Sequence, residues 1–265
     1  MRWKFYNTML KNDRLNKILQ DLNKHGSITV QNLSKNFNVT PETIRRDLET
    51  LENENKLKRV YGGAILIDEN IPEFDLITRK TINIEKKINL ATITTDFVKE
   101  GSMIALDDST TNVEISKSLI KQFNNISCIT NSLSIAQILA TNPSIKILLA
   151  SGRLNNKDLF TYGLSAINFI KMYHPDIFFM SASGINLKHG IMDYGFDQYD
   201  IKTTMKQVSS KTFCVADSTK FGNTATIRVC NFNEVDGIIT DQNLDSQIKE
   251  NFSELGINLF YPENN

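Results

Sequence analysis

The sequence has no long apolar run, no paired cysteines and few histidines. Nowhere do about eighteen apolar residues follow one another, and the opening stretch MRWKFYNTMLKNDR has no apolar segment ahead of a small-residue cleavage site. We therefore expect neither a membrane-spanning helix nor a secretory signal. The protein is expected in the cytoplasm. Cys128, Cys214 and Cys230 are far apart within apolar stretches, which predicts buried thiols rather than disulfides or a zinc site. Neither a metal nor a cofactor is expected.

The formal net charge of zero conceals an uneven distribution of charge along the chain. Residues 1–62 contain twelve Lys and Arg against seven Asp and Glu, whereas the remaining residues contain eighteen against twenty-three. The first part therefore carries a net charge of +5 and the rest −5. A basic head on an acidic body is expected when only one of two domains meets a polyanion.

The basic head is predicted to form three helices followed by a two-stranded hairpin. The apolar residues of NDRLNKILQDLNKHG share one helical face, and QNLSKNFNV predicts a short second helix. Thr40 is the expected N-cap of the third helix, with Pro41 at its first position, where the missing N–H removes no hydrogen bond. In KLKRVYGGAILI, Gly62 and Gly63 separate two short strands.

The third helix, within VTPETIRRDLETLEN, carries the main functional signal of the head. Ile44, Leu48 and Leu51 fall in one narrow sector at helical spacing, so Arg45 and Arg46 must point outward. A helix, a tight turn and a second helix with a basic outer face form the helix-turn-helix plan, whose second helix enters the DNA major groove. Arginine suits this place because it can form two hydrogen bonds to a guanine or bind a phosphate.

An alternative is that the arginines only solvate this helix and pair with Glu42 or Glu49. The basic segment Lys56–Arg59, placed as a wing would be, favours DNA instead. The residues expected to meet double-stranded operator DNA are Thr40, Pro41, Thr43, Arg45, Arg46, Lys58, Arg59 and Tyr61.

The acidic body alternates strand-like apolar runs with helix-length segments. Strands are expected at 103–106, 127–130, 146–150, 176–180, 212–216 and 237–240. This alternation predicts an α/β domain with a doubly wound, mostly parallel sheet. Small hydroxyl residues and glycines follow five of these strands, where backbone N–H groups and helix N-termini can receive an anion. Ligands of such sheets bind outside the carboxyl ends of the strands.

The segments DRLNKIL, SITVQNLSKNFNVTPETIRRDLETLE and KLKRVYGGA resemble the DeoR-type winged-helix repressors of bacterial sugar metabolism. The resemblance extends over essentially the whole chain and implies a winged helix-turn-helix domain at 9–66, a linker at 67–84 and an effector-sensing α/β domain at 85–258. It also implies that the second domain is similar in fold to ribose phosphate isomerase and senses a phosphorylated sugar.

The resemblance also implies a set of effector-binding residues at the strand ends. Hydroxyls and backbone amides would hold the phosphate, Asp107 a sugar hydroxyl, and Lys202 or Lys220 a second charged contact. The sequence departs from the family pattern at Ser109 and Ser151, which replace glycines, and at Gln198, which stands where an acidic residue is expected. The implied residues are Asp107, Ser109, Thr110, Thr111, Thr130, Asn131, Ser132, Ser151, Gly152, Ser183, Gly184, Lys202 and Lys220.

Two classes of function remain open at this point. The first is a DNA-binding repressor that a phosphorylated sugar releases from its operator, and that acts as a homodimer or higher homo-oligomer. The alternative is an enzyme similar to a sugar-phosphate isomerase with an accessory DNA-binding head. Isomerisation needs a placed general base, and neither the lone His174 and His189 nor the carboxylates near the strand ends form a convincing one. We therefore expect a regulator without catalytic residues.

Overall fold

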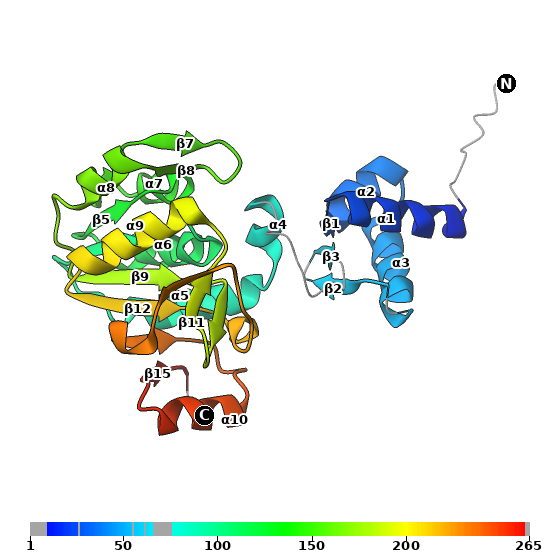
Figure 1. Cartoon of the computed structure of the whole chain (residues 1–265). Coiled ribbons are helices and arrows are strands. Elements are labelled where there is room, and N and C mark those ends of the chain that lie inside the picture. Colours follow the sequence, from blue (N-terminus) through cyan, green and yellow to red (C-terminus); the bar gives the residue numbers. More distant parts are fainter. Residues whose placement is uncertain (1–9, 26, 55, 61, 66–75, 263–265) are drawn as a thin grey trace. The chain divides into compact units, whose positions relative to one another are not determined.

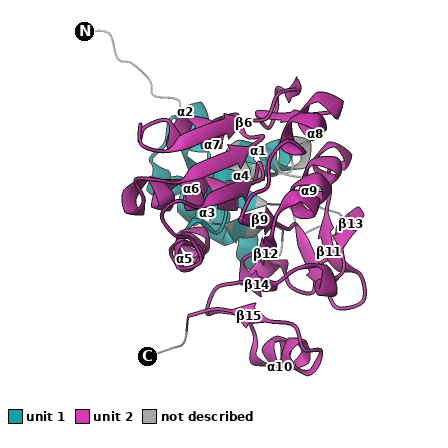
Figure 2. Ribbon diagram, turned by 90° about the vertical axis from the view of Figure 1, so that its left-hand side faces the viewer, with its two compact units in different colours: residues 1–84 teal, residues 85–265 magenta. Residues whose placement is uncertain are grey.

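The computed structural model describes residues 10–25, 27–54, 56–60, 62–65 and 76–262. The chain divides into two compact units, residues 1–84 and 85–265 (Figure 2). We refer to them as the head and the sensor unit. The domain boundaries expected from the sequence remain predictions, and the first half of the expected linker, residues 67–75, lies outside the described residues.

The head contains three helices and a small antiparallel sheet of strand order β1-β3-β2 (Figure 1). A fourth short helix, α4, completes the head. Its elements are α1 (Lys11–His25), β1 (Ser27–Thr29), α2 (Val30–Phe37), α3 (Pro41–Asn53), β2 (Lys58–Val60), β3 (Gly63–Ile65) and α4 (Leu76–Thr81). The predicted three helices and hairpin are therefore confirmed.

Local sequence signals explain how α2 and α3 are joined. Asn38 ends α2 in the left-handed conformation, with φ 52°, which asparagine tolerates better than most residues. Thr40 then caps α3, since its side chain accepts a hydrogen bond from the Thr43 N–H at 3.2 Å. Together these two residues make the tight turn between the helices.

The sensor unit is built on a seven-stranded sheet of order β15-β14-β12-β9-β4-β5-β6, in which every neighbouring pair is parallel. Its elements are α5 (Ile84–Thr95), β4 (Met103–Leu106), α6 (Thr110–Gln122), β5 (Ser127–Thr130), α7 (Leu133–Leu139), β6 (Lys146–Leu149), β7 (Arg153–Asn155), β8 (Phe160–Tyr162), α8 (Leu164–Ile170), β9 (Ile177–Ser181), β10 (Gly184–Asn186), β11 (Gly190–Asp193), α9 (Phe196–Val208), β12 (Lys211–Val215), β13 (Ile227–Cys230), β14 (Gly237–Ile239), α10 (Ser246–Glu254) and β15 (Leu259–Phe260), with single 3₁₀ turns η1 (Ser218–Lys220) and η2 (Phe232–Glu234).

Helices cover both faces of this sheet (Figure 1). One apolar core cluster joins alternate strand residues such as Phe178 to α8 and α9 through Ile170 and Ile201. The other joins the opposite strand residues, such as Phe179, to α6 and α7 through Ile115 and Leu139. Because both faces of each central strand are buried, the strands are nearly continuous apolar runs, as parallel sheets require. The predicted doubly wound α/β fold is confirmed.

All six expected strands are present, each within one residue of its predicted ends, and the three cysteines are buried as expected. The sequence did not indicate the hairpin β7-β8, the small sheet β10-β11-β13, or β15, which lies beyond residue 258 and pairs with β14. Five of these strands include polar residues or glycine, and β15 has only two residues, so none of them is a continuous apolar run in the sequence. No helix in the described part of the chain combines the length and apolarity needed to cross a membrane.

The strand order reverses direction between β4 and β9. The chain adds β5 and β6 on one side of β4, then returns to place β9, β12, β14 and β15 on the other side. Ligands of open α/β sheets bind in the crevice at such a switch point, beyond the carboxyl ends of the strands. The residues that directly follow β4 and β9 therefore lie where a ligand is expected.

Candidate DNA-binding surface and effector site

The outer face of α3 carries the two adjacent arginines. Ile44 is fully buried beneath them, whereas the side chains of Arg45 and Arg46 are 61% and 77% exposed. Both arginines also lie near Glu42, at 3.4 and 3.5 Å. The outward orientation and the alternative pairing with Glu42 are thus both present. Exposed pairs of this kind contribute little free energy, so they leave the guanidinium groups available to a phosphate or a base.

Hydroxyl groups surround the start of α3. The Thr40 hydroxyl caps the helix and lies 2.9 Å from the Thr43 hydroxyl, and Pro41 occupies the first turn. Thr40 and Pro41 are exposed, and Thr43 is half-buried. Since the N-terminal part of a recognition helix meets the base edges, these residues lie in the part of α3 where DNA contacts are expected.

The wing residue Arg59 is held by α3. Its Nε donates to Glu52 Oε2 at 2.6 Å, and its backbone N–H donates to Glu52 Oε1 at 2.7 Å. The hydrogen bond that Arg59 donates to Glu52 raises the pKa of Arg59 above its ordinary value. Lys58 lies in β2, but its side chain and the whole of Tyr61 are outside the described residues. Glu52 therefore fixes the start of the wing against α3.

A buried ion pair between α1 and α3 was missed by sequence reasoning. Arg14 donates to both carboxylate oxygens of Asp47, at 2.5 and 3.0 Å, and the two side chains are only 8% and 2% exposed. The hydrogen bond to Asp47 is the main cause that raises the pKa of Arg14. A signal was present, because helical spacing places Asp47 directly beside the sector occupied by Ile44, Leu48 and Leu51.

In the sensor unit, Asp107 follows β4 at the switch point and is completely buried. Its Oδ2 accepts hydrogen bonds from the backbone N–H and hydroxyl of Ser181, at 2.7 and 3.0 Å. Its Oδ1 accepts from Asn112 Nδ2 at 2.8 Å and from the Ser109 N–H at 3.2 Å. The side chain expected to bind a sugar hydroxyl is thus already satisfied by the ends of β4, β9 and α6.

Lys202 lies in the same buried cluster, only 2% exposed. Its Nζ donates to the Ser181 carbonyl and hydroxyl at 2.9 Å each, is hydrogen bonded to Asp193 and lies 3.4 Å from Asp107. Burial lowers the pKa of Lys202, but the negative charges of Asp107 and Asp193 raise it by more, so the net shift is upward. The amine is therefore a charged structural centre that joins α9 to β9 and β11.

Asp193, at the end of β11, was not identified from the sequence. It accepts hydrogen bonds from Lys202, from the Ser183 hydroxyl at 2.7 Å and from the Tyr194 N–H at 2.8 Å. Burial raises the pKa of Asp193, but the charge of Lys202 and these hydrogen bonds lower it further, to below its ordinary value. No sequence spacing links it to Lys202, because β11 was not predicted.

Two of the remaining predicted residues at the first two strand ends cap helices. Ser109 caps α6 through the Asn112 N–H at 3.0 Å, and Ser132 caps α7 through the Ile135 N–H at 3.4 Å. Thr110 and Thr111 form the first turn of α6 and are buried, as is Thr130, whose hydroxyl accepts from the Ser132 N–H at 3.1 Å. These contacts aim the helix N-termini at the carboxyl edge of the sheet.

Asn131 differs from its neighbours because one of its polar atoms is unsatisfied. Its Nδ2 donates to the Thr161 carbonyl at 3.1 Å. Its Oδ1 is buried and, within the described ranges, has no hydrogen-bond partner. A buried acceptor without a donor is costly, and a ligand hydroxyl or a water molecule would satisfy it. Asn131 is thus the predicted effector residue that retains binding capacity in its buried side chain.

The third strand-end loop holds Ser151 and Gly152. Ser151 is exposed, and its hydroxyl donates to the Ser165 carbonyl at 3.3 Å. Gly152 has φ 143°, and a Cβ at this position would lie 2.5 Å from the Tyr162 carbonyl oxygen. Only glycine fits here without a shift of the backbone. The serine that replaces a family glycine therefore links this loop to α8.

The last predicted loops lie after β9 and β12. Ser183 bonds to Asp193, and Gly184 begins β10, so both are part of the structural network. Lys220 lies in η1, is half-buried, and its side chain has no partner among the residues described. In the same turn, the Ser218 hydroxyl accepts a hydrogen bond from Lys86 Nζ at 2.7 Å, which ties η1 to α5.

Gln198, the departure from the family pattern, contacts the first strand-end loop. Its Nε2 donates to Asp108 Oδ2 at 3.1 Å, and both side chains are buried. A glutamate at this position would set two carboxylates against each other, whereas the amide donates a hydrogen bond. Gln198 therefore holds α9 to the loop after β4.

Comparison with known families agrees with this two-unit structure. Residues 14–70 match the family model of the DeoR-like helix-turn-helix domain, and residues 82–242 match that of the DeoR C terminal sensor domain. The chain belongs to the DeoR family. It is a DNA-binding transcriptional regulator, as its family relatives are.

Curated relatives match almost the whole chain. The HTH-type transcriptional regulator GolR of Listeria innocua is 32% identical over 248 residues, which cover 92% of this chain and 96% of GolR. The uncharacterized regulator YulB of Bacillus subtilis is 36% identical over 237 residues, covering 89% of this chain and 91% of YulB. The glycerol-3-phosphate regulon repressor of Escherichia coli K12 is 28% identical over 235 residues, covering 88% and 92%.

Among solved structures, ribose 5-phosphate isomerase A of Methanocaldococcus jannaschii matches 52% of this chain and 55% of its own. The sequence identity is 15% and the TM-score 0.40. A likeness this weak supports no argument about the site or its chemistry. The assignment of the chain to its family rests on the family models and the curated relatives.

Proposed function

We propose that this protein represses an operon of sugar metabolism and leaves its operator when a phosphorylated sugar binds the sensor unit. The observation that carries the proposal is α3, a capped helix that buries Ile44 and exposes Arg45 and Arg46. Relatives named as repressors of the aga operon and of the glycerol-3-phosphate regulon in Escherichia coli support the regulatory role. Such a regulator acts where its operator lies, so we expect it in the cytoplasm.

The effector part of the proposal is supported by the carboxyl edge of the parallel sheet. Helices α6 and α7 begin at this edge, capped by Ser109 and Ser132, and the positive ends of their helix dipoles favour the negative charge of a ligand. The unsatisfied Asn131 Oδ1 adds an acceptor for a ligand hydroxyl. An anionic, hydroxylated ligand matches both features.

We propose a binding function rather than catalysis for the sensor unit. Asp107 accepts hydrogen bonds on both carboxylate oxygens and is buried beside Lys202, so it has no free lone pair directed at a substrate proton. His174 is exposed and lies 3.1 Å from the Ser210 hydroxyl, and His189 is exposed in the turn before β11. We expect no isomerase activity on pentose or hexose phosphates above the uncatalysed rate.

The test begins with selection of binding sites from random double-stranded DNA by the full chain. We expect a sequence-specific site with two half-sites related by two-fold symmetry, because helix-turn-helix proteins commonly bind as dimers. Sugar phosphates are then added to the complex, and release is followed by fluorescence anisotropy. Binding without sequence preference would contradict the DNA part of the proposal. Complexes that no sugar phosphate releases would contradict the effector part.

A further inference from the structure

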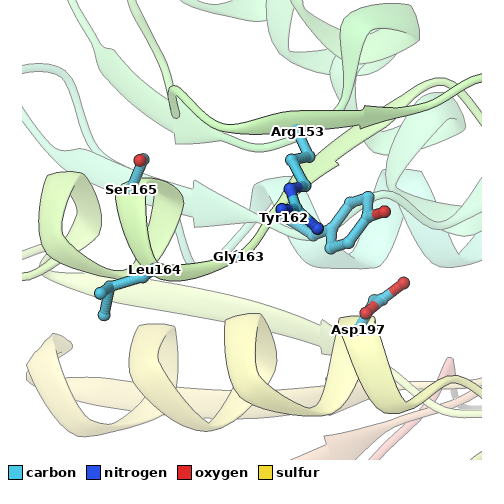
Figure 3. A pocket seen from close by; sticks show the side chains of 6 residues that line it. All are labelled: Arg153, Tyr162, Gly163, Leu164, Ser165 and Asp197. Atoms are coloured by element: carbon cyan, nitrogen blue, oxygen red, sulfur yellow. The ribbon is translucent and has the colours of Figure 1, made fainter.

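A cavity of about 400 Å³ opens between the β7-β8 hairpin and the first turns of α8 and α9 (Figure 3). A volume of this size is typical of small-molecule sites. None of the effector residues expected from the sequence lines this cavity, although Ser151 and Gly152 directly precede Arg153 in the chain. It is lined by Arg153, Tyr162, Gly163, Leu164, Ser165 and Asp197.

Opposite charges face this cavity from two different elements. Arg153 comes from β7, and Asp197 comes from the first turn of α9, with Tyr162 lying between them (Figure 3). Both charged side chains are exposed, and neither has a hydrogen bond or ion pair to any described residue. The cavity thus presents a cation and an acceptor that the protein itself leaves unused.

Arg153 is nevertheless held in a defined place. The preceding Gly152 presses against the Tyr162 carbonyl, where a Cβ would lie only 2.5 Å from the oxygen. Ser151 is hydrogen bonded to the start of α8 at 3.3 Å. The backbone that carries Arg153 is therefore fixed to both β8 and α8, as a preformed binding site requires.

The buried Lys202 is not available to bind a phosphate. Its Nζ is surrounded by Ser181, Asp107 and Asp193, and only 2% of the residue is exposed. A phosphate could reach it only if these contacts broke and three buried polar partners lost their hydrogen bonds. Arg153 has no such partners to lose, and its planar group can form paired hydrogen bonds to phosphate oxygens.

We propose that this cavity is the part of the effector site that selects the ligand, and that Arg153, and not the N-terminus of α6 or α7, contacts the phosphate of the sugar phosphate directly. Asp197 accepts hydrogen bonds from sugar hydroxyls on the opposite side, and Tyr162 forms the wall between the two charges. The proposal rests on the proposed function and names the residues that select the ligand. An anionic group at one end and hydroxyl donors at the other define the ligand class.

The proposal is tested with Arg153→Gln and Asp197→Asn in the full chain. The probes are ribose 5-phosphate, glucose 6-phosphate, glycerol 3-phosphate, their unphosphorylated forms and inorganic phosphate, with binding measured by calorimetry. Arg153→Gln should weaken the binding of the tightest-binding sugar phosphate and of inorganic phosphate alike, by about 10-fold to 100-fold. Asp197→Asn should weaken the sugar phosphate by about tenfold without weakening inorganic phosphate, because it loses a hydroxyl acceptor and a negative charge.

Two matched variants control for charge alone. Lys157→Gln removes a positive charge from the same hairpin, and Asp200→Asn removes a negative charge from the next turn of α9. Both residues are exposed and lie outside the cavity lining. Neither control should change ligand affinity. Equal losses in Lys157→Gln and Arg153→Gln would mean general electrostatic attraction and would overturn the assignment of Arg153.

The failure of this inference differs from the failure of the proposed function. All four variants should bind the selected DNA as the wild type does, since none lies in the head. Suppose that a sugar phosphate binds the wild type and releases it from DNA, and that it binds and releases Arg153→Gln and Asp197→Asn equally well. The cavity is then not the effector site, but the proposed function as a regulator is upheld. If no sugar phosphate binds the wild type, the effector part of the function fails, and this inference fails with it.

Discussion

Arg14 and Asp47 are the residues whose loss should harm the head most. Both side chains are almost completely buried, and the charge of each neutralises the charge of the other. Replacement of Asp47 by Ala removes the carboxylate to which the buried Arg14 donates two hydrogen bonds, and removal of one partner of a buried ion pair costs about 3–5 kcal/mol. We expect Asp47→Ala to lower the free energy of unfolding of the head by this amount. Hydrogen exchange of α1 and α3 in increasing denaturant measures it.

The control removes both charges at once. In Arg14→Met with Asp47→Leu, no buried charge remains, and apolar side chains of similar size fill the space. We expect this double variant to recover most of the stability lost in Asp47→Ala. A double variant as unstable as the single one would mean that the pair contributes specific attraction that apolar contacts do not replace.

Arg45 and Arg46 should act on DNA binding and not on stability, because they are exposed. Replacement of either by Ala should weaken binding to the selected site by about 1–3 kcal/mol. A contact to a base edge would relax the sequence preference, whereas a contact to phosphate would make the salt dependence shallower. Titrations at several salt concentrations separate the two cases.

Lys17 provides the matched control for these arginines. It is exposed on α1, away from the recognition helix in the sequence. Lys17→Ala removes one positive charge from the head and should change affinity less than either arginine variant. If both arginine variants bind like the wild type while their folds are intact, the assignment of α3 as the recognition helix is wrong.

Among the secondary-structure elements, the β7-β8 hairpin depends on one glycine. Gly152→Ala forces a side chain into a backbone conformation with φ 143° and against the Tyr162 carbonyl. Strained backbone of this kind costs about 1–3 kcal/mol. We expect the variant to destabilise the sensor unit in urea denaturation and to weaken the response to the sugar phosphate. Gly101→Ala is the control, because Gly101 also has positive φ, 87°, but open space around its Cβ position.

The buried cluster that joins β4, β9, β11 and α9 predicts a pH dependence. The pKa of Asp193 is lower than usual, so its contribution to stability is complete above the unfolded-state pKa of about 3.9. That contribution is lost as the pH falls through the folded-state pKa. The raised pKa of Lys202 has no effect in this range, because its contribution is lost only at high pH.

Asp193→Asn should therefore be less stable than the wild type at neutral pH but should lose less further stability as the pH falls below about 4. Urea denaturation of the sensor unit at several pH values measures this difference. The exposed Asp200→Asn serves as the control and should follow the wild type. Parallel curves for Asp193→Asn and the wild type would exclude Asp193 as a source of the acid sensitivity.

At the scale of the whole molecule, the proposed function requires that the effector and the operator weaken each other's binding. A ligand shifts an equilibrium only by its differential affinity for the two states, so the sugar phosphate must bind the DNA-released form more tightly. By linkage, DNA weakens the binding of the sugar phosphate by the same factor. The coupling free energy is typically about 1–3 kcal/mol. The hydrogen bond from Lys86 on α5 to Ser218 in η1 ties a proposed effector loop to the first helix of the sensor unit.

Lys220→Ala and Thr110→Ala test whether this competition uses the strand-end loops. Both variants should bind the selected DNA normally but should need more sugar phosphate for release, because the ligand loses contacts that it makes only in the released form. Operator titrations with and without the sugar phosphate measure the shift. Release of both variants as readily as the wild type would remove these two loops from the effector site.

Much of the architecture could be predicted from local sequence signals. The turn between α2 and α3 depends on Asn38 and Thr40, which act on backbone groups within four residues of themselves. The six strands that the sequence predicted in the central sheet could be found because burial on both faces requires continuous apolar runs. Short strands such as β11 and β15 gave no such signal, and their pairing depends on segments far away in the chain.

The candidate site was predictable only in part. Ser109 and Ser132 could be placed just beyond two strands because the apolar runs at 103–106 and 127–130 end there, but their capping of α6 and α7 was not predicted. Asp107 and Lys202 could be named, but their partners could not. Asp107 bonds to Ser181, 74 residues away in the chain, and Lys202 bonds to Asp193 on a strand that the sequence did not indicate. The structure shows both side chains bonded within the fold, and their contact with an effector stays a prediction.

The sequence by itself determined the two units, the capped recognition helix and the parallel sheet, because periodicity, capping and apolar runs act over a few neighbouring residues. Tertiary structure alone decided which polar groups are satisfied and which remain free. Lys202 is enclosed because β9, β11 and α9 meet around it, whereas Arg153 and Asp197 are left facing one cavity without partners. Hydrogen bonding between distant segments depends on strand order and register, which single residues do not encode.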